Sequence, residues 1–323
     1  MDTKGKVLSY LIKSQGENIS GEKIANELQL SRAAIWRAIH SLKEQGHYIA
    51  SNGNKGYMYL QNDIISPEGI KFYLPDKLKD IEIIYYETIN STNKDAKIRA
   101  INGANDRTVI IANNQTDGYG RFERKFYSID KGGIYISIIL KSGPSNENTE
   151  LITIKNAIAL KRVIDKVANV DTKIKWVNDM YLNGKKIIGI LTEGVLDYES
   201  GNISAIIVGT GINFSITNFP EELNNIAGSI FNVEKPQSIR NELIGEYLKE
   251  FFDIYYSDNT KNLIEEYKNA SFVLGKNITF VKNNETIEAK AIDINNKGEL
   301  VVELKSKEII SLFSGEISIK VNL

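Results

Sequence analysis

The sequence of 323 residues contains no cysteine, which excludes disulfide frameworks, thiolate metal sites and a cysteine nucleophile. Its two histidines, His40 and His47, lie close together near the N-terminus, so no histidine triad or zinc cluster is expected elsewhere. No apolar stretch has the length of a membrane span and no apolar leader opens the chain, so we expect a cytoplasmic protein that does not enter membranes. Hydrophobic residues make up 42% and charged residues 25% of the chain. That balance and the length predict two or three globular domains.

The first 60 residues carry eight Lys or Arg against five Asp or Glu, although the whole chain has a net charge of −1. Apolar residues repeat at helical spacing in three short stretches of this segment, and Ser20 and Ser31 precede the second and third as N-caps. A predicted β-hairpin around residues 52–56 follows. Three helices and a hairpin in this order predict a winged helix-turn-helix, whose third helix enters the major groove of DNA.

The third helix is expected to bury Ile35, Ile39 and Leu42 and to present its other face to solvent. An alternative is that its basic residues are simply solvated and that the module binds protein. We predict instead that the outer face, the N-cap and the hairpin tip bind DNA through Ser31, Arg32, Ala33, Trp36, Arg37 and Lys55.

Residues 115–126 lie between two β-branched runs that predict buried strands. Gly118 and Gly120 let the backbone of this loop approach a ligand closely. Arg121 and Arg124 add two permanent cations with bidentate donors. The loop is therefore suited to a phosphate or carboxylate, although Gly and Arg also occur in loops that bind nothing.

Residues 173–193 predict a strand, a tight turn and a second strand. Asn183-Gly184 between two apolar runs is a strong hairpin signal. Such a hairpin brings Asp179, before the turn, into the neighbourhood of Lys186, after it.

These two stretches together resemble the biotin–protein ligases. Residues 118–124 read Gly-x-Gly-Arg-x-x-Arg, and residues 175–191 read Lys-Trp-x-Asn-Asp-x-Tyr-Leu-Asn-Gly-Lys-Lys-x-x-Gly-Ile-Leu. The start of the third helix is similar to the DNA-binding domain of bifunctional biotin ligase–repressors. Five short predicted strands after residue 272 resemble the C-terminal domain of the same family.

The resemblance implies an α+β, multidomain fold. We expect a winged helix-turn-helix at residues 1–62. An α/β biotin ligase catalytic domain, similar to that of class II aminoacyl-tRNA synthetases, is expected at residues 63–271. An SH3-like β-barrel is expected at residues 272–323.

The resemblance also implies an ATP-dependent biotin–[acetyl-CoA-carboxylase] ligase. It would activate biotin as biotinyl-5'-AMP and transfer it to a lysine of a biotin carboxyl carrier protein. The same chain would repress transcription by binding operator DNA, as a homodimer that the adenylate favours. Bringing a carboxylate to the α-phosphate of ATP needs fixed cations and Mg²⁺. Two alternatives are a biotin-sensing repressor with weak or lost ligase activity and a lipoate-type ligase of the same fold.

The roles implied by the resemblance fall on particular side chains. Arg121 and Arg124 would bind the phosphate of the adenylate, and Lys186 the carboxylate and α-phosphate oxygens. Asp179 would orient or deprotonate the acceptor lysine, which makes Arg121, Lys186 and Asp179 the catalytic residues. The metal ligands are unknown, although Asn178 could hold Mg²⁺. The implied biotin contacts are Ser91, Thr92, Asn93, Gln115, Gly118, Tyr119, Gly120, Arg121 and Lys186. The implied adenylate contacts are Arg121, Arg124, Asn178, Asn213 and Phe126. Residues 209–213 read Gly-x-Gly-Ile-Asn, which in the family ends a core strand beside the ligand, and residues 216–235 resemble the segment that covers the adenine.

Some of these residues also have a purely structural interpretation. Ser91 or Thr92 would N-cap a helix, and capping alone accounts for their chemistry. The loop departs from the family pattern Gly-Arg-Gly-Arg-x-Gly-Arg-x-Trp, since Tyr119 replaces the first Arg, Glu123 the later Gly and Phe126 the Trp. We expect the anion of Glu123 to weaken retention of the adenylate.

Overall fold

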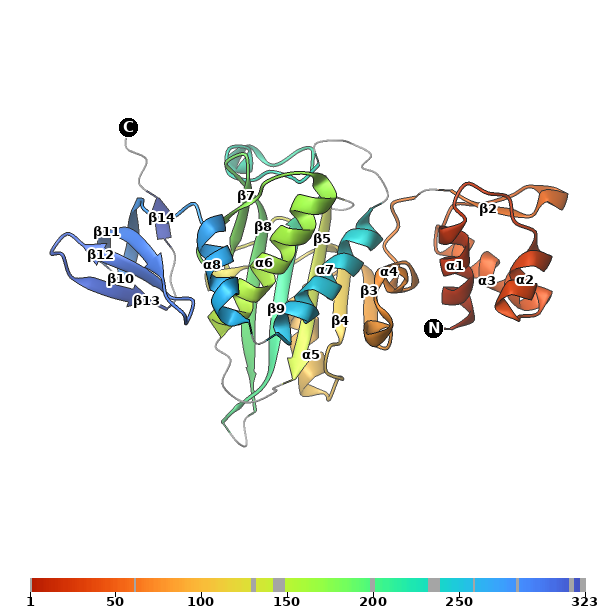
Figure 1. Cartoon of the computed structure of the whole chain (residues 1–323), viewed down its shortest axis with the longest axis horizontal. Coiled ribbons are helices and arrows are strands. Elements are labelled where there is room, and N and C mark those ends of the chain that lie inside the picture. The colour runs from red at the N-terminus through yellow and green to blue at the C-terminus, as the bar shows by residue number, and fades with distance from the viewer. Residues whose placement is uncertain are drawn as a thin grey trace. The chain divides into compact units, whose positions relative to one another are not determined.

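The computed structural model describes residues 2–60, 62–128, 132–141, 149–197, 201–231, 239–257, 259–282, 285–313 and 317–319. The chain divides into two compact units, one of residues 1–81 and 235–249 and one of residues 82–234 and 250–323 (Figure 1). No helix within the described ranges is long and apolar enough to cross a membrane.

The first unit contains the predicted winged helix-turn-helix. The side chain of Ser20 accepts a hydrogen bond from the backbone N–H of Lys23, and that of Ser31 from the N–H of Ala34, so both act as the expected N-caps. Leu8 and Ile35 are among the buried residues of its core. Its elements are α1 (Thr3–Lys13), α2 (Gly21–Leu28), α3 (Arg32–Glu44) and the antiparallel pair β1 (Ile49–Ser51) and β2 (Tyr57–Tyr59).

The rest of this unit is α4 (Pro67–Tyr73) and the first part of α7 (Arg240–Tyr255). Asn241 joins the two segments, because it accepts from the backbone N–H of Ser66 and donates to the carbonyl of Ile64. The guanidinium of Arg240 lies 2.9 Å from the Asp63 carboxylate. Polar contacts therefore fix the α7 start against the segment that follows the wing.

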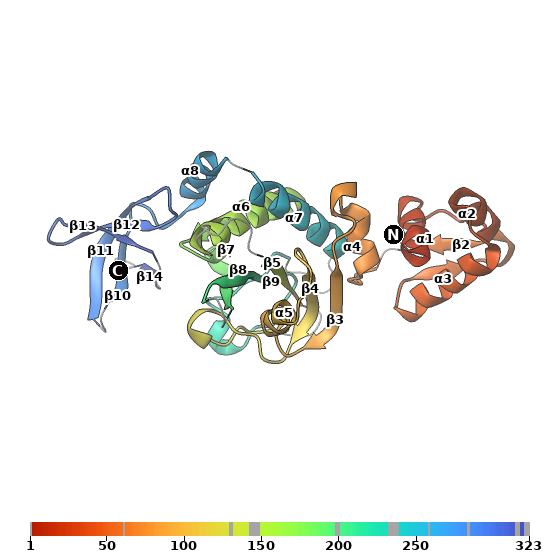
Figure 2. The same ribbon diagram turned by 90° about the horizontal axis from the view of Figure 1, so that it is seen from below.

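A seven-stranded sheet organises the second unit, in the order β3-β4-β5-β9-β8-β7-β6. Only the β3–β4 pair is parallel, and α5 (Thr92–Ile101) connects those two strands. Figure 2 shows α5 on one face of the sheet and α6 (Thr149–Ala168) on the other. The strands are β3 (Ile83–Ile89), β4 (Val109–Gln115), β5 (Gly133–Lys141), β6 (Lys173–Lys175), β7 (Asp179–Leu182), β8 (Lys185–Leu196) and β9 (Ile203–Asn213).

The predicted hairpin is confirmed between β7 and β8. Asn183 and Gly184 have φ values of 51° and 79°, the left-handed conformation that a two-residue turn between twisted strands requires. The turn sets Asp179 opposite Gly189 and Tyr181 opposite Lys186.

After α8 (Thr260–Ala270), five antiparallel strands form a second sheet in the order β13-β12-β11-β10-β14. Ile278, Ala291 and Leu300 are fully buried in it. The five strands expected after residue 272 are confirmed as β10 (Asn277–Lys282), β11 (Glu285–Ile294), β12 (Leu300–Leu304), β13 (Ile309–Leu312) and β14 (Ile317–Ile319).

Candidate active site

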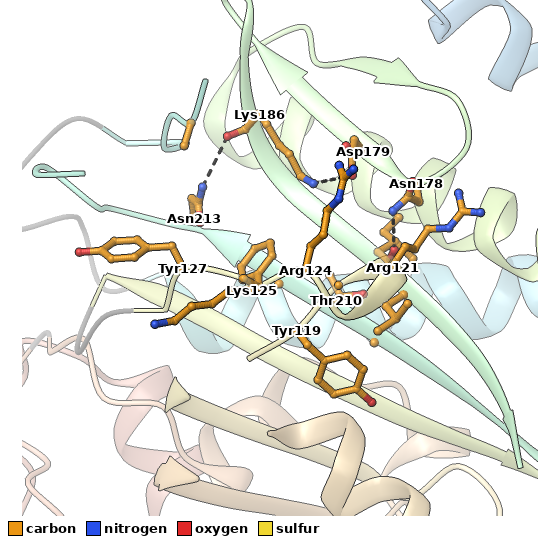
Figure 3. A pocket seen from close by; sticks show the side chains of 18 of the residues that line it. Tyr119, Arg121, Arg124, Lys125, Tyr127, Asn178, Asp179, Lys186, Thr210 and Asn213 are labelled. Carbon is orange, nitrogen blue, oxygen red and sulfur yellow. Dashed lines mark hydrogen bonds and ion pairs between the residues drawn. The ribbon is translucent and has the colours of Figure 1, made fainter. Parts of the chain in front are cut away.

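A pocket on the α5 side of the central sheet brings together most of the predicted ligand residues (Figure 3). The strands β8 and β9 supply the floor, and the loop after β4 supplies a wall. Gly118 is the exception, because it does not line the pocket. Its carbonyl accepts from the N–H of Phe126, and a Cβ there would lie 2.8 Å from Gln115 Nε2. The predicted residues that do line it are Ser91, Thr92, Asn93, Gln115, Tyr119, Gly120, Arg121, Arg124, Phe126, Asn178, Asp179, Lys186 and Asn213.

One end of the pocket is rich in amides and hydroxyls. Gln115 Oε1 accepts from the backbone N–H of Thr92 at 2.8 Å and from its hydroxyl at 3.0 Å. Ser91 accepts from the N–H of Lys94 and so caps α5 while also lining the pocket. The capping and ligand interpretations of these residues are therefore compatible.

Three strand glycines form the floor. Gly209 and Gly211 belong to the Gly-x-Gly-Ile-Asn run that the resemblance places beside the ligand, whereas Gly189 was not assigned from the sequence. Gly189 on β8 is paired with Gly211 on β9, and Gly209 lies two residues before Gly211 on the same face. A Cβ at Gly209 would lie 2.2 Å from Asn93 Oδ1, and one at Gly211 would lie 2.7 Å from the ring of Phe126. Glycines at alternate positions of a strand were the available signal, because they mark a close approach of other groups.

Cations gather at the other end. The Lys186 ammonium lies 2.7 Å from Asp179 Oδ1, so the hairpin joins the acid and the amine as expected. This contact is one of charge, without hydrogen-bond geometry. Asp179 is the one carboxylate among the described lining residues, which also include five cations. These are Arg121, Arg124, Lys186 and two lysines that the sequence analysis missed, Lys125 and Lys175.

Backbone contacts hold this cationic end in place. Asn178 Nδ2 donates to the carbonyl of Ile190 at 2.9 Å, and the N–H of Ile190 donates back to the Asn178 carbonyl. Asn213 Nδ2 donates to the Gly228 carbonyl at 2.9 Å, and the N–H of Gly228 donates to the carbonyl of Lys186. The segment after β9 is thereby attached to the start of β8. It adds Phe219, Leu223, Ile226 and Ala227 to the lining. These residues belong to the segment that the resemblance places over the adenine.

The aromatic residues have distinct surroundings. Trp176 is almost fully buried and donates from Nε1 to the Gly298 carbonyl at 2.9 Å. Phe126 packs edge-on against Tyr135. Both line the pocket while also packing against other parts of the second unit. Figure 3 shows the Tyr119 ring directed away from Arg121 and the other cations.

Two residues of the loop adopt the left-handed conformation. Phe122 and Glu123 both have φ of 56°. Glycine adopts this conformation without steric cost, whereas a residue with a Cβ is strained in it. The family glycine at the position of Glu123 thus has a backbone explanation.

The predicted DNA-binding face is exposed on the first unit. Ile35, Ile39 and Leu42 are buried, as expected from the helical spacing. Trp36 is 58% exposed and its ring stacks on that of His40. The side of α3 and the hairpin that face solvent include Ser31, Arg32, Ala33, Arg37 and Lys55.

Comparisons with known proteins cover almost the whole chain. The model of the biotin/lipoate A/B protein ligase family matches residues 85–213, an HTH domain model matches residues 4–58, and the biotin protein ligase C-terminal domain matches residues 273–320. The chain is 32% identical to the bifunctional ligase/repressor BirA of Bacillus subtilis, over 98% of this chain and 99% of the relative. It is 25% identical to the protein of that name from Escherichia coli, over 95% and 94%.

Solved structures show the same fold. A biotin protein ligase from Aquifex aeolicus in complex with biotin and ATP superposes with a TM-score of 0.63 at 24% identity. The match covers 74% of this chain and 98% of that protein.

Proposed function

The chain belongs to the family of bifunctional biotin ligase–repressors, and from that membership we propose that it activates biotin with ATP and transfers the biotinyl group to a lysine of a biotin carboxyl carrier protein. The observation that carries this proposal is the pocket, which has an amide-rich end and a cationic end on one glycine floor. Biotin needs hydrogen-bonding partners for its ureido ring, and its carboxylate needs cations beside ATP. The pocket offers both.

The first step joins two anions. The biotin carboxylate attacks the α-phosphorus of ATP, pyrophosphate leaves and biotinyl-5'-AMP forms. Arg121 and Arg124 bind the phosphate oxygens, and Lys186 binds the oxygens where negative charge builds. Asn178 and Asp179 add hard oxygen donors at this end, which suit Mg²⁺ bound with ATP. When bound, Mg²⁺ would neutralise phosphate charge.

The second step transfers the acyl group. The acceptor lysine amine attacks the acyl carbon, AMP leaves and an amide bond forms. Asp179 orients this amine or takes its proton. Because Asp179 is paired with Lys186 in the ligand-free chain, we propose that the phosphate draws Lys186 away and releases the carboxylate for the acceptor.

The acid lies along the glycine floor with its ring at the amide-rich end. Ser91, Thr92 and Gln115 supply donors and acceptors there, and Asn93 closes the end over Gly209. The backbone at Tyr119 and Gly120 and the ring of Phe126 complete the enclosure. Asn213 supports the adenylate end.

The first unit carries the repressor role. We propose that α3 and the wing bind operator DNA, and that the chain does so as a homodimer favoured by the adenylate. The cytoplasm is the proposed setting, since ATP, carrier protein and DNA are available together there. Sedimentation and operator affinity, each measured with and without biotin and ATP, test this part. Equal values under both conditions would contradict it.

Partial reactions test the site assignment. Lys186→Met should abolish biotin-dependent exchange of pyrophosphate into ATP, whereas Lys185→Met changes a neighbouring lysine outside the pocket lining and should not. Asp179→Asn should retain the exchange and lose transfer from preformed adenylate. If Lys186→Met exchanges as fast as the wild type, the assignment of the cationic end is wrong.

A further inference from the structure

Glu193 on β8 lies behind the pocket wall and is not itself a lining residue. Its Oε2 accepts from the Tyr119 hydroxyl at 2.8 Å and from Asn93 Nδ2 at 2.9 Å. Its Oε1 accepts from the Lys97 ammonium at 2.6 Å. One carboxylate therefore holds three donors that come from two other segments, the glycine loop and α5.

Two of those donors line the pocket. Asn93 is fixed from its other side as well, because Ser137 donates to its Oδ1 at 2.6 Å, deep in the sheet. A Cβ on Gly209 would collide with this amide. Asn93 Nδ2 also donates to the Leu191 carbonyl at 3.4 Å, so Glu193 supplies one of the three hydrogen-bond partners that hold Asn93 over the floor.

Tyr119 lies in the same loop as Arg121 and Arg124. The ammonium groups of Lys94 and Lys97 lie 5.5 Å and 5.7 Å from the centre of its ring. Lys94 also forms an ion pair with Asp117, two residues earlier in the loop. Burial, with the nearby Glu193 carboxylate, raises the pKa of the Tyr119 phenol, so the phenol remains a hydrogen-bond donor.

Backbone hydrogen bonds close the loop on both sides of Tyr119. The N–H of Gly120 donates to the Arg124 carbonyl at 2.8 Å, and the N–H of Phe126 donates to the Gly118 carbonyl at 2.9 Å. The hydrogen bond of the Tyr119 hydroxyl therefore also restrains the backbone positions from which the Arg121 and Arg124 side chains extend.

We propose that Glu193 is a positioning residue that fastens the glycine loop to α5 and β8 through Tyr119 and Asn93, and so retains the bound acid and its adenylate in the pocket. This inference rests on the proposed ligase function. Glu193 contacts no substrate, and its effect passes through Asn93, which closes the ring end, and through the loop that carries the arginines. Retention, rather than the chemical step, is what it controls.

The test uses the full chain with Tyr119→Phe, Glu193→Gln and the double variant. Each single change should speed release of labelled biotinyl-adenylate about tenfold or more and raise the KM for biotin, because a hydrogen bond to a charged group is lost. Single-turnover transfer from freshly loaded enzyme should keep its rate. The double variant should be no worse than the more affected single variant, since Tyr119→Phe removes only a contact that Glu193→Gln already weakens.

A matched control and a rescue accompany these variants. Tyr85→Phe removes another tyrosine-to-glutamate hydrogen bond, to Glu87 on β3, away from the pocket lining, and should leave release unchanged. Tyr119→Arg provides a guanidinium that can donate to Glu193 and should restore retention.

Several outcomes would overturn the proposal. One is release of the adenylate at the wild-type rate from both single variants. Another is an equal loss of adenylate formation, retention and transfer together with a lower Tm, since that indicates a merely structural role. If wild-type chain forms no adenylate, the ligase function fails, and calorimetric biotin binding by wild type and Glu193→Gln then decides: equal affinities reject the positioning role. Absence of biotin binding by wild type rejects both.

Discussion

Single residues in this pocket are constrained by the space around them as much as by their chemistry. Gly209 has room for a hydrogen and no more, because Asn93 lies directly over it. Gly194, on the neighbouring strand, has ordinary van der Waals space around its position, with the nearest atom at 3.4 Å on Ile203. A methyl group therefore fits at Gly194 and does not fit at Gly209.

Gly209→Ala should therefore lose biotin binding. The methyl group pushes Asn93 out of the ring end of the pocket, and overpacking of this kind costs about 1–3 kcal/mol of stability. Gly194→Ala is the control and should bind biotin like wild type. Calorimetry and thermal unfolding of both variants make the comparison. Normal biotin affinity in Gly209→Ala would show that Asn93 does not close the site.

His47 and Asp63 in the first unit have pKa values that move in opposite directions. Burial lowers the pKa of His47 from 6.5 to about 4. Burial raises the pKa of Asp63 from 3.8 to about 6, against the opposing effect of Arg240. Between pH 4 and 6.5, His47 binds more protons in the unfolded chain than in the folded chain. Its contribution to the free energy of unfolding therefore falls as the pH falls from 6.5 towards 4. Between pH 3.8 and 6, Asp63 binds more protons in the folded chain. Its contribution to the free energy of unfolding therefore falls as the pH rises from 3.8 towards 6.

The two contributions oppose each other, and variants should separate them. Relative to wild type, His47→Gln should make the free energy of unfolding of the first unit fall more steeply as the pH rises from about 4 to 6. Asp63→Asn should make it rise over the same range. Urea titrations at several pH values, following the transition of the first unit, give these slopes. Slopes of the same sign in both variants would contradict the account.

At the level of elements, α3 combines a buried stripe with an exposed basic face on one short helix. Its stripe packs Ile35 and Leu42 inward while Arg37 remains exposed. The connection between β1 and β2, which forms the wing, adds the exposed Lys55. This arrangement is typical of a helix that enters the major groove.

Arg37→Ala should weaken binding to an operator duplex selected with the wild-type chain by about 1–3 kcal/mol. Lys13→Ala removes an exposed basic residue at the end of α1 and should have little effect. Fluorescence anisotropy at fixed salt compares the two. Equal losses would indicate that only net charge matters, and no loss in either would favour a protein partner for this face.

Most elements could be predicted because their signals are local. The helix caps, the Asn183-Gly184 turn and the alternation of the C-terminal strands are each encoded within a few residues. The function of Glu193 could not be predicted, because Tyr119 and Lys97 reach it from segments distant in sequence. The role of Gly189 was missed for the same reason, since it depends on what packs against the strand, whereas Gly209 and Gly211 were placed beside the ligand through the family resemblance. Lys125 and Lys175 gave no signal beyond their charge.

For the whole molecule, the DNA-binding unit and the ligase site occur in one chain, and the family match extends over nearly all of it. The three domains predicted from the sequence, divided at residues 62/63 and 271/272, stay a prediction. The structure divides the chain into two compact units with other boundaries. The same ligand then serves enzyme and repressor, because the adenylate is both the reaction intermediate and the proposed signal for DNA binding.

The central claim is that the acid joined to the acceptor is biotin. ATP-dependent labelling of a biotin carboxyl carrier domain, with biotin and lipoate supplied together, measures this directly. We predict an amide of biotin on the acceptor lysine and none when Lys186 is replaced by Ala. Transfer of lipoate in preference to biotin, or biotin binding without any transfer by the wild-type chain, would contradict the account.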